Sequence, residues 1–396
     1  MKQNYFMGLI ACAALTMTGC SNDEINAPQQ SQGNNAIEFS TYLGRNAQGS
    51  RGTETNTTSI QTSGFGVLAY YTEQVDFADT NKPNFMWNQQ VTYSNSAWSY
   101  TPIKYWPTKV GDKVSFFAYA PYVAGGDANG IVLSKNNVAG APTATITLPE
   151  DPSQTIDFVA AVQMNKTHDN SATANNDVSF TLKHEMTRVK VQAKLDKSVY
   201  DASDAKHKTF VVIKNVTFND NGQFYKSGKY TFSTTDGERG TWTTTDNATA
   251  YSLDLNKVMK KETIKATGAK GSTVSGDYQK GEDGIKLVND TPVSLFKDDQ
   301  YLFLIPVASL TDGKATATIE YDIVTEDSKL AVGYSCTNAT KIVKLPAGTL
   351  QQGKSYNYTF IINLDEIVLD AAVEKWDETA SDSNINVPYT PDDATK

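Results

Sequence analysis

Histidine and cysteine, the side chains that most often carry catalysis or bind metals, are scarce in this chain of 396 residues. There are three cysteines and three histidines, His168, His184 and His207. No histidine stands at a metal-ligand spacing from another histidine, a cysteine or a pair of carboxylates. This pattern predicts no metal site, no cofactor and no enzymatic activity.

The segment HEMTR, residues 184–188, begins like the zinc-protease signature, in which two histidines stand four residues apart on a helix. Arg188 takes the position of the second histidine. The surrounding alternation is that of a strand, which would direct His184 and Glu185 to opposite faces. We therefore expect no catalysis there. No nucleophile elbow, phosphate-binding loop or complete dinucleotide-binding glycine pattern occurs elsewhere in the sequence.

Arginine is also rare, and its placement is uneven. The chain has 35 basic residues, of which four are arginines: Arg45, Arg51, Arg188 and Arg239. The first two follow directly on the strand-like run IEFSTYLG, residues 37–44, in the small polar segment RNAQGSRG. A segment of that composition reads as an exposed loop that a protease can bind in extended form. On the residues alone, two solvated loop cations are the competing interpretation.

The run before these arginines reads as a strand with one apolar face. Alternation places four residues on that face: Ile37, Phe39, Thr41 and Leu43. Such a strand can fill a groove in a β-sandwich. Burial of its three large apolar side chains would contribute roughly 1.5–3 kcal/mol each.

The N-terminus has the form of an export signal. Lys2 precedes the apolar run FMGLIACAALTM, which is too short to span a bilayer. Residues 17–20, MTGC, resemble a bacterial lipobox, in which the cysteine is acylated and becomes the new N-terminus. We predict a lipoprotein signal peptide over residues 1–19, lipidation of Cys20 and a flexible polar tether over residues 20–35.

One cysteine is expected to remain in the folded part of the mature chain. Cys12 would leave with the signal peptide and Cys20 would carry lipid, so Cys336 alone would stay in the folded part. An intrachain disulfide is therefore excluded. We expect Cys336 to be a small buried apolar residue.

Composition and patterning favour a mostly β protein. A formal net charge of −9 offers no basic face to phosphates, so nucleic acid is not expected as a partner. Short strand-like runs alternate with Gly, Pro, Asn and Asp, and no long stretch keeps a helical rhythm. We expect an all-β fold of two tandem β-sandwiches with few short helices, over residues 36–176 and 177–380, and a tail over residues 381–396. The division lies at the polar segment 165–177.

A cluster of aromatic residues leaves a second function open. Six of them fall within twenty residues: Trp87, Tyr93, Trp98, Tyr100, Tyr105 and Trp106. Flat rings on a β-sandwich can stack sugars, so the alternative is a surface glycan-binding lipoprotein that uses Trp87, Trp98 and Trp106. Alternation along this stretch would instead bury about half of the rings in a core.

Several phrases together resemble the fimbrillin-like family, the type V pilins and accessory fimbrial lipoproteins of anaerobic Gram-negative bacteria. These phrases are WSYTPIKYWPTKVGDKVSFFAYAPY (98–122), IDFVAA (156–161), VSFTLKHEMTRVKV (178–191), YLFLIPV (301–307) and LPAGTLQQGKSYNYTFIINL (345–364). Their order and spacing carry the resemblance, which runs from the lipobox to about Trp376.

The resemblance implies two transthyretin-like β-sandwiches in series in a lipoprotein of the outer membrane and the cell-surface fimbrium. It also implies an arginine-specific surface protease that cuts after the first strand. The lost strand opens a groove, which a strand of another pilin subunit fills by donor-strand exchange. Arg45 and Arg51 are then the candidate cut sites, and the strand at residues 37–43 is the one displaced. A host or bacterial surface ligand is a further expected partner.

The tail, residues 381–396, is the candidate donor because Ile385, Val387 and Tyr389 alternate with other residues. Pro388 and Pro391 argue against this role, because proline cannot donate to a strand ladder. A mobile acidic terminus is the alternative. A subunit whose tail cannot donate would be a tip or accessory subunit rather than a stalk subunit, so the sequence leaves these roles open.

Overall fold

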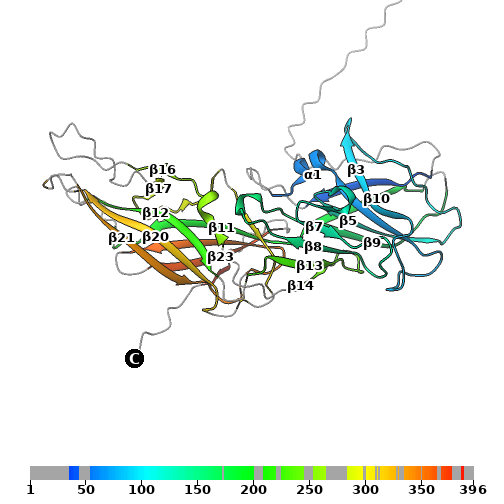
Figure 1. Cartoon of the computed structure of the whole chain (residues 1–396). Coiled ribbons are helices and arrows are strands. Elements are labelled where there is room, and N and C mark those ends of the chain that lie inside the picture. The colour runs from blue at the N-terminus through cyan, green and yellow to red at the C-terminus, as the bar shows by residue number, and fades with distance from the viewer. Residues whose placement is uncertain are drawn as a thin grey trace, which may run out of the picture.

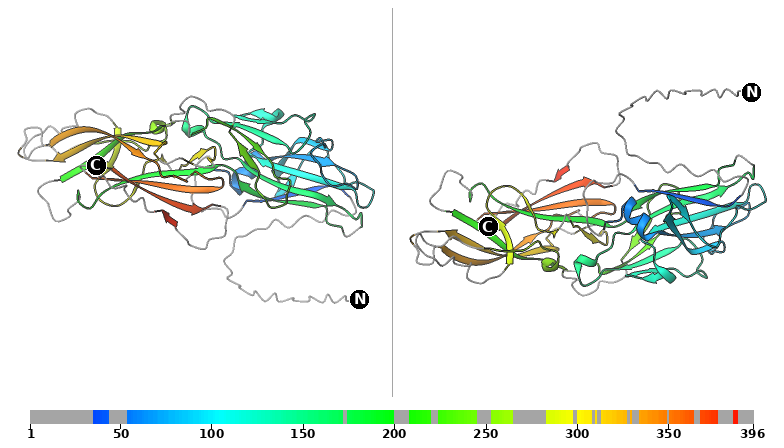
Figure 2. Two further views of the ribbon diagram at one scale, coloured as in Figure 1. Left: turned by 90° about the horizontal axis from the view of Figure 1, so that it is seen from below. Right: turned by 90° about the horizontal axis from the view of Figure 1, so that it is seen from above.

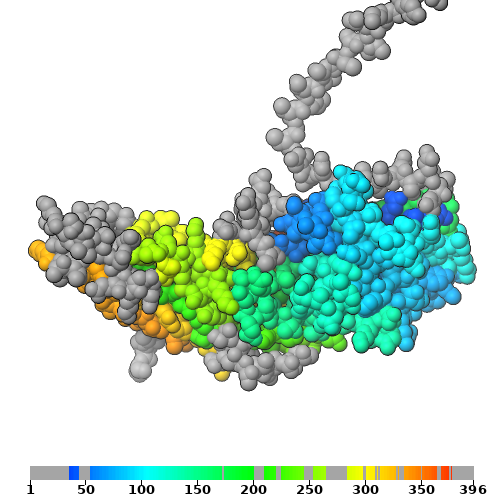
Figure 3. Space-filling model, turned by 45° about the horizontal axis from the view of Figure 1, so that its top comes forward, coloured from blue at the N-terminus to red at the C-terminus, as the bar shows by residue number. Residues whose placement is uncertain are grey.

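The structure is a computed structural model that describes residues 35–43, 54–171, 174–199, 208–219, 224–244, 253–264, 283–297, 300–307, 310, 313–326, 329, 334–348, 350–363, 367–376 and 385–387. Within this part the chain is built almost entirely of strands, in two halves that lie end to end (Figures 1 and 2). The space-filling view shows both halves as one elongated body, with the helix α1 near its middle (Figure 3). The all-β fold is therefore confirmed, while the transthyretin-like likeness of each half stays a prediction.

The N-terminal half contains two sheets. In the first, of seven strands, the order is β1 (Glu38–Leu43), β10 (Asp177–His184), β9 (Val159–Thr167), β5 (Lys113–Ala120), β2 (Phe65–Tyr71), β3 (Met86–Ser94) and β4 (Ala97–Ser99). In the second, of five strands, it is β14 (Thr241–Thr243), β13 (Ser227–Thr231), β8 (Thr143–Thr147), β7 (Ile131–Leu133) and β6 (Asp127–Ala128).

The C-terminal half also contains two sheets. One runs β18 (Val293–Ser294), β11 (Thr187–Leu195), β22 (Lys354–Ile362), β23 (Ile367–Lys375) and β24 (Ile385–Val387), with β19 (Leu302–Leu304) paired to β11. The other runs β16 (Glu262–Thr263), β17 (Asp283–Leu287), β12 (Lys208–Asn219), β20 (Thr316–Glu326) and β21 (Tyr334–Lys344), with β15 (Leu253–Asp254) paired to β12.

Helical structure in the described part is short. The α-helix α1 (Thr57–Ser63) starts at Asn56, whose side chain accepts from the backbone N–H of Ser59, while the Ser59 hydroxyl oxygen accepts from the Asn56 N–H. This reciprocal capping box fixes where the helix begins. Three 3₁₀ turns complete the set: η1 (Ala124–Gly126), η2 (Pro152–Gln154) and η3 (Leu255–Lys257). No helix in the described part is long and apolar enough to cross a bilayer.

The seven-stranded sheet is covered on both faces. Its central strands β2 and β5 are therefore almost continuously apolar and buried, rather than alternating. One face packs on the five-stranded sheet in a core that continues into the C-terminal half. The other face curls around a second apolar cluster, which includes Phe65 and Val67 of β2, Phe116 of β5 and the inward side chains of β1.

The expected division at 176/177 falls between two strands of one sheet, because β10 pairs with β9 and with β1. The hairpin of β13 and β14 also joins the N-terminal half by pairing with β8. The N-terminal sheets thus include strands that the expected division assigned to the C-terminal sandwich. β10 belongs to the N-terminal sheet because its backbone hydrogen bonds are made with β1 and β9. These partners cannot be predicted from a polar segment next to β10 in the sequence.

Cys336 corrects a second expectation. It is exposed on β21, whereas the sequence suggested a small buried residue. β21 is the last strand of its sheet, and most of its side chains are exposed. An edge position therefore explains the exposure of a residue type that is more often buried.

Candidate functional site

The first strand, β1, closes the curled seven-stranded sheet. On one side it pairs in parallel with β10 from Glu38 opposite Asp177 to Leu43 opposite Leu182. On the other side, Ala36 forms an antiparallel bridge with Tyr105, just beyond β4. The N–H of Ile37 donates to the Lys104 carbonyl at 2.9 Å, so the start of β1 is hydrogen-bonded on both sides.

The apolar face of β1 points into the second core. Ile37, Phe39 and Leu43 have exposed fractions of 1%, 5% and 2%. The ring of Phe39 lies against three aromatic rings, with centroid distances of 5.1 Å to Tyr100 and 5.9 Å to both Phe116 and Phe180. These contacts form an aromatic socket, which we define as the rings of Tyr100, Phe116 and Phe180.

Polar contacts fix the register of β1. The Tyr100 hydroxyl donates to the Ile37 carbonyl at 2.9 Å, and the Ser40 hydroxyl donates to Oδ2 of Asp177 at 2.7 Å. Burial raises the pKa of Tyr100 to about 12, so this hydroxyl remains a donor at neutral pH. Burial also raises the pKa of Asp177, and the hydrogen bond from Ser40 opposes that rise.

Thr41 is the inward residue of β1 that fits least well. Its hydroxyl oxygen is buried and has no hydrogen-bond partner among the described residues. A buried hydroxyl without a partner costs free energy. Of the four residues on the expected inward face, Thr41 therefore contributes least to holding the strand.

Several expected site residues lie outside the described part: Cys20, Arg45, Arg51 and Tyr389. The two arginines fall in residues 44–53, between β1 and Glu54. The other two arginines are held in the fold. Arg188 has a side-chain exposure of 7%, and Nη1 of Arg239 donates to the His184 carbonyl. Residues 385–387 form β24, whose backbone pairs with β23 of the same chain.

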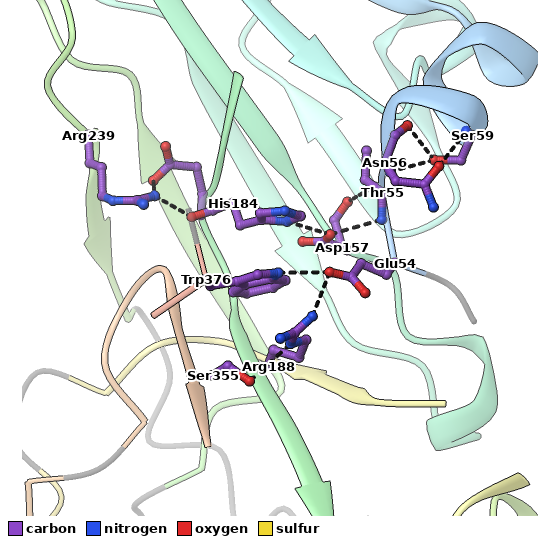
Figure 4. A network of polar contacts seen from close by, with 11 residues as sticks. Glu54, Thr55, Asn56, Ser59, Asp157, His184, Arg188, Arg239, Ser355 and Trp376 are labelled. Atoms are coloured by element: carbon purple, nitrogen blue, oxygen red, sulfur yellow. Dashed lines mark hydrogen bonds and ion pairs between the residues drawn. The ribbon is translucent and has the colours of Figure 1, made fainter. Parts of the chain in front are cut away.

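The described chain resumes at a buried polar cluster between the two halves (Figure 4). Oε1 of Glu54 accepts from Nη1 of Arg188 at 2.7 Å and from the indole N–H of Trp376 at 2.8 Å. The guanidinium of Arg188 also donates through Nε to the Ser355 hydroxyl at 3.0 Å. The guanidinium carbon lies 4.4 Å from the ring centre of Tyr301, so Arg188 makes a cation–π contact in addition to its hydrogen bonds.

A second set of contacts joins the same cluster. Oδ2 of Asp157 lies 2.7 Å from Nδ1 of His184 and accepts from the backbone N–H of Thr55 at 2.9 Å. The imidazole of His184 stacks on the indole of Trp376, with centroids 3.9 Å apart (Figure 4). Burial raises the pKa of Asp157, and the neighbouring imidazole opposes that rise.

We name this cluster the junction clamp; its members are Glu54, Thr55, Asp157, His184, Arg188 and Trp376. Asp157 and His184 belong to the N-terminal half, whereas Arg188 is in β11 and Trp376 follows β23 in the C-terminal half. The clamp therefore fixes the chain at the first residues after the 44–53 segment and ties them to both halves. Sequence reasoning missed it, because Glu54 and Arg188 stand 134 residues apart and no local pattern links them.

The segment HEMTR spans the turn between β10 and β11 rather than the interior of one strand. His184 contacts Asp157, while Glu185 lies 3.7 Å from Nη1 of Arg239. Both side chains are buried in separate polar contacts. Among the described residues, no group of three or more His, Cys, Asp or Glu side chains could hold a metal ion.

The three tryptophans considered for sugar stacking lie in different surroundings. Trp106 is 4% exposed and stacks on His168 with centroids 5.3 Å apart. Trp87 is half-buried and donates its indole N–H to the Ser134 carbonyl. Trp98 is half-buried against Phe65. Because sugar stacking needs an exposed ring face, Trp106 does not meet the requirement.

Comparison with known proteins places this architecture in a family. The profile of the family described as fimbrillin-like matches residues 51–376. The chain is 28% identical over 403 residues to the fimbrium subunit Fim1C of Phocaeicola vulgatus, covering 96% of this chain and 98% of that protein. It is also similar to the crystal structure of a fimbrial protein from Bacteroides vulgatus, with a TM-score of 0.71, 25% identity and coverage of 86% of this chain and 99% of that one. The family match spans most of the chain and confirms the resemblance seen in the sequence: the chain belongs to the fimbrillin-like family.

Proposed function

We propose that this chain is a structural, non-catalytic subunit of a cell-surface fimbrium. It is exported as a lipoprotein acylated at Cys20, which anchors it in the outer membrane. An arginine-specific protease cuts after Arg45 or Arg51, and β1 then leaves the N-terminal half. A strand from another pilin subunit takes its place, and the fibre grows by this donor-strand exchange.

The observation that carries this proposal is the position of β1. The strand fills the closing position of a curled sheet, its apolar face is buried, and the candidate cut sites follow it directly in sequence. A cut in residues 44–53 leaves β1 attached by non-covalent contacts alone. The strand is thus a separable part of the core, which is what exchange requires.

The free energy involved suits an exchange reaction. Burial of Ile37, Phe39 and Leu43 contributes roughly 5–9 kcal/mol in total. Departure of β1 uncovers that apolar surface and the unpaired edge of β10, which favours capture of a replacement strand. The uncut chain keeps its own strand in place, so the precursor stays monomeric until it is processed.

The junction clamp supports the same order of events. Glu54 stands three residues after Arg51, and its carboxylate is held by Arg188 and Trp376. After a cut at Arg51, the new N-terminus is fixed within a few residues of its end. Loss of the first strand can then proceed without unravelling α1 and β2, which follow in sequence.

A protease experiment tests the proposal. The chain without its signal peptide is cut with an arginine-specific protease, and the products are mapped by mass spectrometry. A dye-labelled peptide of residues 35–43 is then added in excess. We expect the cut protein to exchange its own strand for the labelled one, and the uncut precursor not to do so.

The matched control replaces Arg45 and Arg51 by lysine, which keeps the charge and removes both cut sites. This variant should neither be cut in the loop nor exchange, and the two single variants identify the site used. Exchange into the uncut control, or protease resistance of both arginines in the unmodified chain, would refute the processing step. Replacement of Cys20 by serine should release the exported protein from the membrane fraction.

A further inference from the structure

The place of β1 sets demanding conditions on any strand that replaces it. The backbone N–H of Glu38 donates to the Asn176 carbonyl on the β10 side, whereas that of Ile37 donates to the Lys104 carbonyl on the opposite side. Successive backbone N–H groups of a strand point to opposite sides. The occupant thus needs N–H groups directed toward β10 along its length and, at its first residues, also one directed toward Lys104.

The side-chain conditions are equally specific. The inward positions of Ile37, Phe39 and Leu43 are buried, and the second of them lies in the aromatic socket. The outward position of Ser40 supplies the hydroxyl that donates to Asp177. A matching strand therefore has apolar residues at alternate positions, an aromatic residue at the second inward position and a hydroxyl directly after it.

We propose that the occupant of this groove is a strand of a different subunit and not residues 381–396 of a second copy of this chain. The inference rests on the proposed function and names its partner. It makes assembly heterotypic: two copies of this chain do not follow one another in the fibre, so this chain acts as a tip or accessory subunit.

Proline placement carries the argument. Pro388 and Pro391 are three positions apart, an odd offset, so their nitrogens point to opposite sides of an extended strand. Suppose that the tail lies in the groove with Ile385, Val387 and Tyr389 directed inward. If it runs in the same direction as β1, the backbone nitrogen of Pro388 faces β10. If it runs in the opposite direction, the backbone nitrogen of Pro391 faces β10 instead. In either direction, one proline nitrogen therefore faces β10 and cannot donate a hydrogen bond to it. This missing donor is the general reason why proline is confined to strand edges and ends.

Registers in the direction of β1 add a side-chain mismatch. If Val387 takes the place of Ile37, Tyr389 and Thr390 suit the places of Phe39 and Ser40, but Asp393 falls on the buried position of Leu43. In the same register Pro388 takes the place of Glu38, whose N–H donates to the Asn176 carbonyl. If Val387 takes the place of Phe39, Pro388 falls on Ser40 and removes the hydroxyl that serves Asp177.

The pairing of β24 is consistent with a separate role for the tail. Its backbone lies antiparallel to β23, with Val387 opposite Ala371 and Ile385 opposite Val373. β23 is bonded to β22 on its other side, so β24 occupies an ordinary edge position. At an edge, a proline is tolerated where its nitrogen faces away from the neighbouring strand.

Peptide competition on the cut full-length protein tests the inference. Three dye-labelled peptides are compared: residues 35–43, residues 383–393, and residues 383–393 with the changes Pro388→Val and Pro391→Val. Fluorescence anisotropy reports incorporation, and native mass spectrometry reports the oligomeric state without peptide. We expect the first and third peptides to enter the groove and the natural tail peptide to bind at least about 100-fold more weakly, from one lost ladder bond and one mismatched side chain. The cut protein alone should remain monomeric.

The outcomes separate the two proposals. Binding of the natural tail peptide within about tenfold of its proline-free counterpart, or fibres formed by the cut protein alone, would overturn heterotypic assembly and leave the fimbrial role intact. Failure of residues 35–43 to enter would overturn the exchange mechanism itself, and the inference with it.

Discussion

Replacement of Glu54 by alanine should destabilise the protein strongly, because it leaves a buried charge without its partner. The carboxylate accepts from Arg188 at 2.7 Å and from Trp376 at 2.8 Å, and the side chains of Glu54 and Arg188 are 6% and 7% exposed. Removal of one partner of a buried ion pair costs about 3–5 kcal/mol. The guanidinium keeps its contacts with Ser355 and Tyr301, so we expect about 3 kcal/mol.

Urea-induced unfolding, followed by tryptophan fluorescence, measures this loss. The matched control is Asp76→Ala, which removes an equally short contact of 2.6 Å to Lys113 at the surface. An exposed pair of that kind contributes at most about 1 kcal/mol. The double variant Glu54→Met with Arg188→Met should recover most of the stability, because an apolar replacement of both partners leaves no uncompensated charge.

The clamp also gives a readout that ordinary destabilisation would not produce. In the protein cut at Arg51, an aminopeptidase should trim Gly52 and Thr53 and stop before Glu54. The alanine variant should be trimmed further, into α1, at the same temperature and urea concentration. The reasoning fails if Glu54→Ala costs no more than Asp76→Ala, or if trimming passes residue 54 equally in both proteins.

The contacts of β1 yield four further predictions. Phe39→Ala should release it, since loss of a buried phenylalanine costs about 3–5 kcal/mol, and the labelled-peptide exchange rate measures this. Thr41→Val should slow exchange several-fold, because it removes a buried hydroxyl that has no partner among the described residues. Ser40→Ala should raise the pKa of Asp177 further, since the lost hydrogen bond lowers it, and a carboxyl NMR titration follows the change. The folded-state pKa of Tyr100 is raised from 10.0 to about 12. The protonated Tyr100 hydroxyl therefore contributes fully to retention of β1 below pH 10, and this contribution is lost as the pH rises from 10 to 12. In Tyr100→Phe, retention of β1 should not show this pH-dependent loss.

The sequence predicted the local properties of β1 well. Alternation is sufficient to assign Ile37, Phe39 and Leu43 to one face, and these three side chains are indeed buried. Tyr42 lies between two of the inward positions and is 48% exposed, as alternation requires. Thr41 was placed on the inward face by period alone, without any indication that its hydroxyl would lack a partner.

Long-range pairing could not be predicted in the same way. That β1 runs parallel to β10, and that β13 pairs with β8, depends on strands that are far apart in sequence. Local periodicity gives a strand its faces but not its neighbours. For the same reason the polar segment 165–177 suggested a domain division. In the structure, His168 of this segment stacks on Trp106, and the strands on either side of the segment, β9 and β10, pair in one sheet.

Covalent attachment, more than the strength of the contacts, explains why proteolysis should control exchange in the proposed mechanism. A strand joined to its groove by about ten residues competes at an effective concentration in the millimolar range. An incoming strand at micromolar concentration must therefore bind about 1,000-fold more tightly, or about 4 kcal/mol, to displace it. A cut in residues 44–53 removes this advantage without altering any contact of β1. Because Glu54 stays clamped, the cut also leaves the rest of the core in place, so the groove that opens has the shape of the strand that left it.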